Sequence, residues 1–150
     1  MEKVLISACI LGVNCRYDGL NCKNPEIDNL IKQYDCVPFC PEVSGGMSTP
    51  RKKSCIRNIE TMMPATGQDV LEKKARVYSE DGEDVTDFFI KGANECLKMI
   101  KELNISKAFL KSRSPSCGVT SVSCFGTVIK GSGVCAAVLN KHNIELIEKS

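Results

Sequence analysis

The chain has no tryptophan, a single histidine and no pair of cysteines with C-x2-C spacing in its 150 residues. Structural zinc sites take four protein ligands, and C-x2-C pairs are common among them. The lone histidine, His142, lies near the end of an expected helix, where a cation interacts favourably with the helix dipole. The composition therefore argues against a conventional structural zinc site.

Long apolar runs and an excess of one charge are also missing. No segment approaches the roughly 20 apolar residues that a membrane-spanning helix needs, and the N-terminus lacks the apolar core of a signal peptide. Twenty basic residues against eighteen acidic ones leave a formal charge of +2, which is too small to indicate nucleic-acid binding. We therefore expect a cytoplasmic monomer with neither a membrane nor a nucleic acid as its partner.

Cysteine, by contrast, is abundant. The ten thiols stand at positions 9, 15, 22, 36, 40, 55, 96, 117, 124 and 135. In a reducing cytoplasm this number indicates metal binding or thiol chemistry rather than a disulfide framework. Free cysteine also serves as a small buried apolar residue. We interpret Cys96, on the apolar face of a helix, and Cys124, in a Ser/Val-rich stretch, in this second way.

Strand-like and helix-like periods alternate along the chain. Short apolar runs predict strands at 4–8, 36–39, 107–111 and 144–148. Three- and four-residue spacing predicts helices at 25–34, 85–103 and 134–142. Asn24 and Ser132 are the expected caps, a turn is expected at Asp81-Gly82, and residues 43–75, which show little periodicity, read as a functional loop. The alternation predicts a single-domain α/β fold over 1–150, with a doubly wound, mostly parallel sheet and helices on both faces.

Three of the expected strands deliver a cysteine at or just past their carboxyl ends: Cys9, Cys40 and Cys117. Ligands of such sheets bind beyond the carboxyl ends of the strands, so these thiols should meet at one edge. Cysteine thiolates hold iron–sulfur clusters, and three protein ligands would leave one iron open, as catalytic metal sites leave an open position. Spacing alone leaves Cys15 and Cys135 as rival ligands.

Four motifs then add a resemblance. They are "ISACILGVNCRYDG" at 6–19, "CPEVSGGMSTPR" at 40–51, "SPSCG" at 114–118 and "GSGVCAAVL" at 131–139. Together, in this order and over about residues 4–148, they resemble the thiouracil desulfidase family, long known only as a domain of unknown function. The resemblance implies a [4Fe–4S] cluster held by Cys9, Cys40 and Cys117. Its free iron is expected to take the sulfur of a thiocarbonyl substrate, a small thiolated base.

The expected reaction is hydrolytic and involves no net redox change. Iron polarises the C=S bond as a Lewis acid, while Glu42 acts as general base on a water and later as a proton donor. The products are the oxo-pyrimidine and hydrogensulfide. The family pattern also gives Ser114 a role in orienting or protonating the substrate. The plainer alternatives are a solvated loop carboxylate for Glu42 and an ordinary turn residue for Ser114.

Three further residues are candidates for substrate binding. Ser7, two residues before Cys9, is expected to donate a hydrogen bond to a cluster sulfur. Arg16 and Asp18 either contact a base edge or stabilise their loop through a local ion pair. The "GSG" turn that precedes a helix is a weak signal for an anion site.

Two other functions compete with the desulfidase. One is a non-catalytic protein that carries a cluster or zinc, with Cys135 or Cys15 in the fourth position. The other is a thiol oxidoreductase that uses Cys36 and Cys40, although C-x3-C is not the spacing of the common redox motif.

Overall fold

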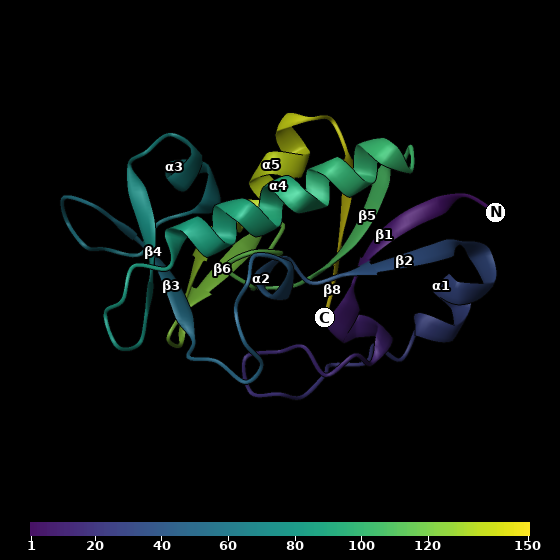
Figure 1. The fold of residues 1–150 in the computed structure, drawn as a ribbon, viewed down its shortest axis with the longest axis horizontal. Coiled ribbons are helices and arrows are strands. Elements are labelled where there is room, and N and C mark those ends of the chain that lie inside the picture. The colour runs from purple at the N-terminus through teal and green to yellow at the C-terminus, as the bar shows by residue number, and fades with distance from the viewer.

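A parallel four-stranded sheet is the centre of the fold in the computed structural model, which describes residues 1–150 (Figure 1). The strand order is β2-β1-β5-β8, and all three pairings are parallel. The strands are β1 (Lys3–Ser7), β2 (Asp35–Phe39), β5 (Lys107–Lys111) and β8 (Glu145–Lys149). Each coincides with a predicted strand to within a residue or so, which confirms the parallel sheet.

Both faces of this sheet are covered by helices, as predicted. Val4 and Ile6 pack on one face with η1 (Ala8–Leu11) and α1 (Ile27–Gln33). Leu5, between them in sequence, packs on the opposite face with α4 and α5, because successive side chains of a strand point to opposite sides. The bounds of these two helices are α4 (Thr86–Glu102) and α5 (Val134–Lys141).

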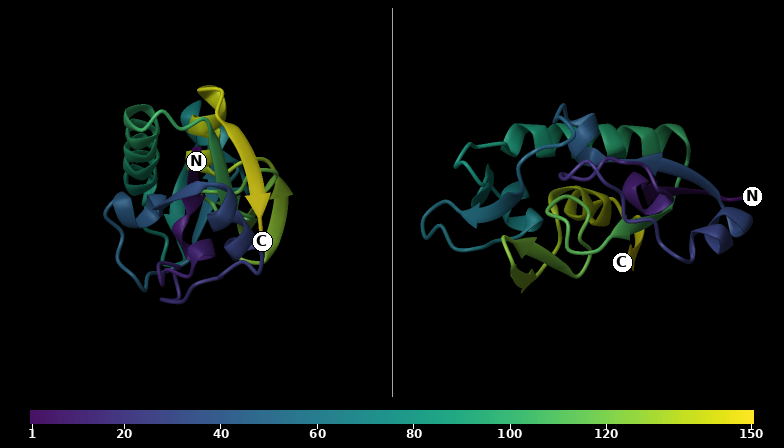
Figure 2. Two further views of the ribbon diagram at one scale, coloured as in Figure 1. Left: turned by 90° about the vertical axis from the view of Figure 1, so that its right-hand side faces the viewer. Right: turned by 90° about the horizontal axis from the view of Figure 1, so that it is seen from below.

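Two small antiparallel sheets lie at the end of the molecule away from the parallel sheet, and α4 runs from beside β4 (Ala75–Ser79) to beside β5 (Figures 1 and 2). One sheet pairs β3 (Ser54–Asn58) with β4, and the other pairs β6 (Ser121–Cys124) with β7 (Thr127–Lys130). Two short helices precede these strands, α2 (Pro41–Ser44) and α3 (Gly67–Leu71).

The expectation of one irregular loop over 43–75 is therefore wrong. Within this range lie β3 and α3, each only five residues long, too short to produce a clear period. One local signal was available: Thr66 and Asp69 form a capping box, in which each side chain accepts a hydrogen bond from the other's backbone N–H.

The turn at Asp81-Gly82 and the long helix after it are confirmed. Gly82 has a φ of 81° and donates from its backbone N–H to the Ser79 carbonyl at 2.9 Å. α4 then runs for 17 residues, and Asn104 follows its end with a φ of 55°. None of the helices has the combination of length and apolar character required to cross a bilayer.

The two predicted caps are wrong. α1 begins after Glu26, and α5 begins after Gly133, neither of which caps through its side chain. Asn24 instead accepts from the Glu26 N–H at 2.8 Å, forming a turn just before the helix. At α5 the N–H groups of Val134 and Ala136 are bonded to a neighbouring loop, as described below, and Gly133, not Ser132, is the residue before the helix.

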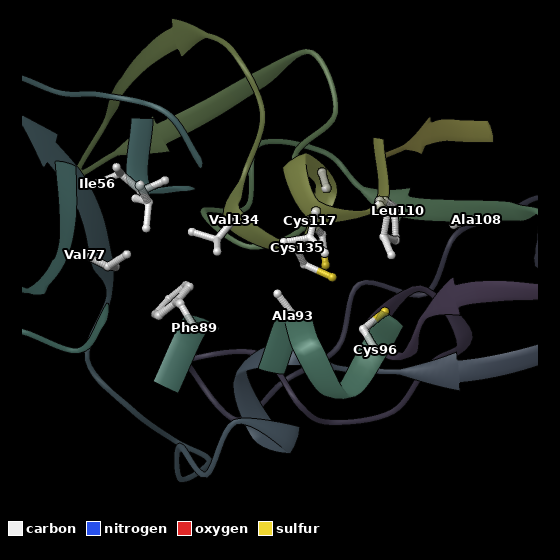
Figure 3. Packing of buried hydrophobic residues seen from close by; sticks show 14 of the residues in the cluster. Ile56, Val77, Phe89, Ala93, Cys96, Ala108, Leu110, Cys117, Val134 and Cys135 are labelled. Carbon is white, nitrogen blue, oxygen red and sulfur yellow. The ribbon is translucent and has the colours of Figure 1, made fainter. Parts of the chain in front are cut away.

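α4 and α5 pack against each other over the sheet and bury a pair of thiols between them (Figure 3). Cys96 of α4 and Cys135 of α5 are both fully buried, and the two thiols are neighbours. This contact, together with burial, raises the pKa of Cys135 well above its ordinary value. The expectation that Cys96 lies on the apolar face of its helix is confirmed.

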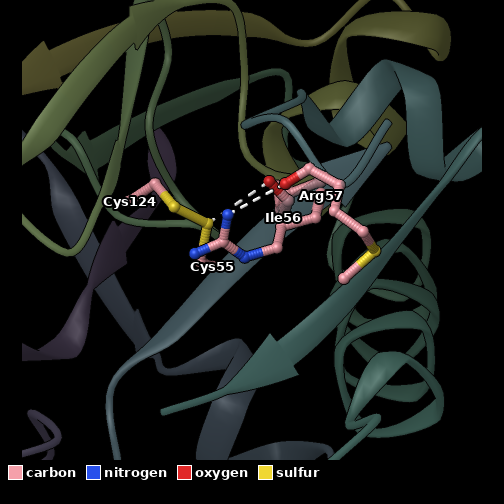
Figure 4. Close-up of a disulfide and its surroundings, with 5 residues drawn as sticks. Cys55, Ile56, Arg57 and Cys124 are labelled. Carbon is pink, nitrogen blue, oxygen red and sulfur yellow. Dashed lines mark hydrogen bonds between the residues drawn. A yellow bond between two sulfur atoms is a disulfide. The ribbon is translucent and has the colours of Figure 1, made fainter. Parts of the chain in front are cut away.

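Cys124 is not merely a small buried apolar residue, because it forms a disulfide with Cys55 (Figure 4). The two Cα atoms are 4.7 Å apart, within the range that a disulfide spans. The bond joins β3 to β6 across a sequence separation of 69 residues. Neither strand's own sequence indicates this pairing, which depends on how the two small sheets meet.

Candidate active site

A cavity of about 300 Å³ opens at the carboxyl ends of β1, β2 and β5. The last residue of each of these strands lines it, and so do the loops that follow. Four thiols also line it, and these are Cys9, Cys15, Cys40 and Cys117. The structure therefore brings together the three cysteines selected from the strand ends and adds a fourth.

Each of the three strand-end thiols is placed by the element that follows its strand. Cys9 lies in η1, directly after β1, and Cys40 is the residue before α2, directly after β2. α2 packs closely against α4. The two backbones are so near each other that a side chain at Gly92 would overlap the backbone carbonyl of Pro41. The close approach of these two backbones fixes the end of β2, and with it Cys40.

The loop that carries Cys117 is held by the N-terminus of α5. The Val134 N–H donates to the Pro115 carbonyl at 2.8 Å, and the Ala136 N–H donates to the Ser116 carbonyl at 3.0 Å. These donors are the groups that an anion at the helix N-terminus would need. The "GSG" turn therefore serves to anchor the Cys117 loop, and its helix is not an anion site.

Cys15 is the fourth thiol of the cavity. It is only 7% exposed, and its thiol has those of Cys9 and Cys40 as neighbours. The Cys40 thiol also lies 3.8 Å from the Cys15 carbonyl oxygen. The other rival, Cys135, does not line the cavity, and neither does Cys36.

Three thiols of the cavity, those of Cys15, Cys40 and Cys117, have a raised pKa. A hydrogen bond from Cys15, followed by burial, raises the pKa of Cys40 far above its usual range. For Cys15 itself, the bond with Cys40 lowers the pKa, but the bond with Cys9 and burial together raise it to about 11. Burial raises the pKa of Cys117 to about 12, against opposing hydrogen bonds from Ser7 and Ser116. A coordinating metal would deprotonate such thiols, so its binding would release protons.

The donor set fits an iron–sulfur cluster better than a single metal ion. No three His, Cys, Asp or Glu side chains lie close enough to hold one ion. In a cluster each thiolate binds a different iron, so the sulfurs need not converge on a single point. Thiolates are also the ligands that iron–sulfur clusters take. The buried thiols around one cavity therefore suit a cluster.

Glu42 is a paired carboxylate at the same cavity, only 14% exposed, and not a solvated loop residue. Its Oε1 accepts from Arg51 Nε at 3.0 Å, and its Oε2 accepts from the Ser116 hydroxyl at 2.9 Å. A guanidinium and a hydroxyl therefore fix the two oxygens in place. Each oxygen keeps a second lone pair with which it can accept a proton.

Ser114 shapes the loop around Cys117. Its Oγ accepts from the backbone N–H groups of Ser116 at 3.1 Å and Cys117 at 3.0 Å. It also shares a hydrogen bond with Ser116 Oγ at 2.9 Å. Ser114 lines the cavity, but the serine that contacts Glu42 is Ser116, which the sequence analysis did not select. The available signal was its position directly before Cys117.

The three predicted substrate-binding residues are placed differently from one another. Ser7 is 3% exposed, lines the cavity and accepts from the Lys111 N–H at 2.9 Å, which links β1 to β5. Arg16 also lines the cavity and lies 3.8 Å from the Asp18 carboxylate. Asp18 itself does not line it and accepts from the Leu20 N–H at 3.0 Å. The structure thus brings Ser7 and Arg16, but not Asp18, to the cavity.

The far wall of the cavity comes from the two small sheets, and sequence reasoning missed it. Ser54 of β3 and Ser123 of β6 line the cavity, each directly beside one partner of the disulfide. Phe125, in the β6–β7 turn, lines it too. The basic residues of this wall are Lys52, Lys53 and Arg113. The only signal in the sequence was the short basic stretch at 51–53, which does not include Arg113.

Known proteins are similar to this chain in both sequence and fold. A family model described as 2-thiouracil desulfurase matches residues 4–150. A Bacillus subtilis (strain 168) protein described as the uncharacterized protein YbbK is 37% identical over 150 residues, covering 98% of this chain and 95% of that protein. A solved structure described as the [4Fe-4S]-dependent thiouracil desulfidase TudS has a TM-score of 0.82 and 33% identity, covering 99% of this chain and 91% of that one.

Proposed function

Because this chain belongs to the 2-thiouracil desulfurase family, we propose that it is a single-domain enzyme that hydrolyses the C=S bond of a thiolated pyrimidine. One observation carries this proposal: four thiols and a buried, ion-paired carboxylate line the same cavity of about 300 Å³. That volume is at the lower end for small-molecule sites, which favours a single-ring substrate. The dependence of a solved relative on a [4Fe-4S] cluster supports the cofactor.

Cys9, Cys40 and Cys117 would hold the cluster in this proposal. When bound, the cluster supplies a Lewis-acidic iron with an open position for the exocyclic sulfur of the substrate. The protein's part is to supply three thiolates from three strand ends. Ser7 and Arg16, which line the cavity, would contact the substrate, with Asp18 acting through Arg16.

Glu42 accepts a proton from the attacking water. Arg51 Nε donates to Glu42 Oε1 at 3.0 Å, which fixes the orientation of the carboxylate that serves as the general base. The oxygen of water becomes the oxo group of the pyrimidine, and the sulfur departs as hydrogensulfide. Water supplies the proton of the hydrogensulfide and releases its second proton, so no electrons are transferred and no external reductant is required. Ser114 and Ser116 keep the Glu42 oxygen Oε2 in a fixed hydrogen bond.

A sulfide-release assay tests this function. The protein is reconstituted anaerobically with iron and sulfide and then incubated with 2-thiouracil or 4-thiouracil. We expect hydrogensulfide and uracil in equal amounts, with none from protein that lacks iron. Release of oxidised sulfur, or no release from fully loaded protein, would contradict the hydrolytic reaction. Cytoplasmic location, a monomeric state and the absence of a nucleic-acid partner remain predictions.

Cys15 favours a second candidate, a non-catalytic cluster protein in which a fourth thiolate closes the site. The observation behind it is that Cys15 contacts both Cys9 and Cys40. Mössbauer spectroscopy of the loaded protein separates the two functions, because three thiolate ligands leave one iron distinct from the others. Four equivalent irons, unchanged by added thiouracil, would favour the closed site.

A thiol oxidoreductase that uses Cys36 and Cys40 finds no support. Cys36 lies within β2 and does not line the cavity. Four residues along an extended strand span roughly 13 Å, well beyond the Cα separation of about 7 Å that a disulfide tolerates.

A further inference from the structure

The pair formed by Arg51 and Glu42 differs from every other ion pair of the molecule. Their side chains are 6% and 14% exposed. In each of the other pairs at least one side chain is 32% or more exposed. Exposed pairs contribute little to stability, whereas removing one member of a buried pair leaves an uncompensated charge. The burial of this ion pair beside the cavity therefore indicates that it has a specific role in the site.

Arg51 makes more contacts than neutralising Glu42 requires. Its Nη2 donates to the Cys15 carbonyl at 2.9 Å, and its backbone N–H donates to the Tyr17 carbonyl at 2.7 Å. In a third contact, Nη1 donates to the Ser48 carbonyl at 3.2 Å, which also fixes the guanidinium. Cys15 and Tyr17 belong to the segment 12–24, called here the N-terminal loop. Arg51 therefore fastens this loop in two places.

The Glu42 carboxylate links the remaining parts of the site. Glu42 follows Cys40 by two residues on α2, and its Oε2 accepts from Ser116, the residue directly before Cys117. Through Arg51 the same carboxylate is joined to the N-terminal loop. One carboxylate and one guanidinium thus connect the chain segments that carry all four thiols of the cavity, since the N-terminal loop follows η1 and its Cys9.

We propose that Arg51 is a positioning residue with two effects. It holds Glu42 in the orientation needed for the base chemistry, and it pins the N-terminal loop so that Cys15 stays beside Cys9 and Cys40 in the cluster-free protein. The first effect rests on the function proposed above. The second concerns the shape of the site before a cluster is bound and does not depend on the reaction.

A lysine cannot replace this arginine. The guanidinium is a planar fork, and here Nε reaches Glu42 while Nη2 reaches Cys15. Lysine offers one ammonium on a flexible stem, so it can neutralise the carboxylate but cannot also hold a carbonyl of the N-terminal loop. Arg51→Lys therefore separates the two effects, and Arg51→Gln removes both.

Hydrogen–deuterium exchange on cluster-free protein tests the loop without any activity measurement. In Arg51→Lys and Arg51→Gln we expect amide exchange over 12–17 to rise about tenfold or more, since the side-chain hydrogen bond to the carbonyl of the buried Cys15 is lost. Iodoacetamide should also modify Cys15 faster, as measured by mass spectrometry. Arg76→Gln, which breaks an exposed pair with Asp84, is the matched control and should change neither. Unaltered exchange in both Arg51 variants would overturn the pinning role.

Steady-state kinetics on the loaded enzyme test the other effect. We expect Arg51→Gln to lower kcat by about 10²-fold, because small displacements of a catalytic group have that consequence, with KM changed less than threefold and the cluster absorbance per chain kept. Arg51→Lys should recover part of kcat, and guanidinium ion should partly rescue Arg51→Ala. A raised KM with unchanged kcat would make Arg51 a substrate contact and overturn the assignment.

The outcomes of the two experiments are separable. If wild-type protein releases no sulfide, the proposed function fails, and the exchange measurement still decides whether Arg51 pins the loop. If Arg51→Gln is insoluble, Arg51→Lys keeps the charge pair and still tests the loop. Normal kcat together with normal loop exchange in Arg51→Lys would refute the need for the guanidinium fork.

Discussion

The cavity has two walls that are built by different means. The inner wall consists of the ends of parallel strands, and its thiols and Glu42 are buried and held by short hydrogen bonds to neighbouring loops. The outer wall consists of two antiparallel hairpins that a disulfide joins. Phe125, on this outer wall, is 42% exposed.

The difference suggests separate roles, with the reaction at the inner wall and substrate recognition at the outer wall. The inner wall presents groups whose positions are fixed by the central sheet, α4 and α5, as a reacting centre requires. The outer wall is attached to that centre through fewer elements and ends in solvent-exposed turns, which are the usual place for recognition. Changes to the inner wall should therefore affect the cluster and kcat, and changes to the outer wall should affect KM and stability.

Removal of a strand-end thiol should have the largest effect. Cys9→Ala, Cys40→Ala and Cys117→Ala should each abolish the brown absorbance of the cluster and the release of sulfide together, because each thiolate holds its own iron. Absorbance spectra and iron content of anaerobically reconstituted protein measure the first, and the sulfide assay measures the second. Cys22→Ala, at a thiol outside the cavity, is the control. A variant that keeps its cluster would show that the wrong three thiols were chosen.

Glu42→Gln should rank next. It keeps the shape of the side chain but removes the base, so kcat should fall by about 10²–10⁴-fold while the cluster absorbance remains. Glu42→Ala should in addition lower stability by about 3–5 kcal/mol, because Arg51 is left buried without a partner. Stopped assays and urea unfolding give the two quantities. Full turnover in Glu42→Gln would remove the general-base role.

The inner wall was largely predictable from sequence because its signals are local. Apolar runs such as "KAFLK" define the strands, and parallel pairing sends their carboxyl ends to one edge. Cys9, Cys40 and Cys117 therefore meet wherever the strands pair in that way. The choice of these three over the other cysteines, and the cluster itself, came from the family resemblance and not from spacing.

The outer wall was not predictable because it depends on contacts between distant segments. β3 carries no clear period, and the partner of Cys55 is 69 residues away. Arg51 and Ser116 were missed for a similar reason, since each gains its meaning only when Glu42 comes within hydrogen-bonding distance. Ser132 was misjudged as a cap because the loop around Cys117 supplies carbonyl acceptors for the N–H groups of Val134 and Ala136.

Opening the disulfide should test the outer wall. Cys55→Ser with Cys124→Ser should lower the free energy of unfolding by about 2–4 kcal/mol, because the bond closes a long loop of the unfolded chain. The hairpins should also lose their fixed spacing, so KM for the thiolated base should rise while kcat and cluster content stay within about twofold. Urea unfolding and steady-state kinetics measure these changes. Loss of the cluster in this variant would show that the two walls are not independent.

The smallest effect concerns the alkaline stability of the inner wall in cluster-free protein. Burial raises the pKa of Cys117 to about 12 in the folded state, from an ordinary value near 9.0. The unfolded chain therefore loses this proton first, so the stabilising contribution is complete below about pH 9 and is lost as the pH rises toward 12. Between pH 8 and pH 10.5 the free energy of unfolding should fall further in the wild type than in Cys117→Ala, and the difference should be at most about 2 kcal/mol. Unfolding curves of both proteins at the two pH values measure this difference. Cluster-loaded protein should not show this difference, because its bound thiolate is already ionised. If the free energy of unfolding of the wild type and of Cys117→Ala falls equally at high pH, the thiol is not buried as the inner wall requires.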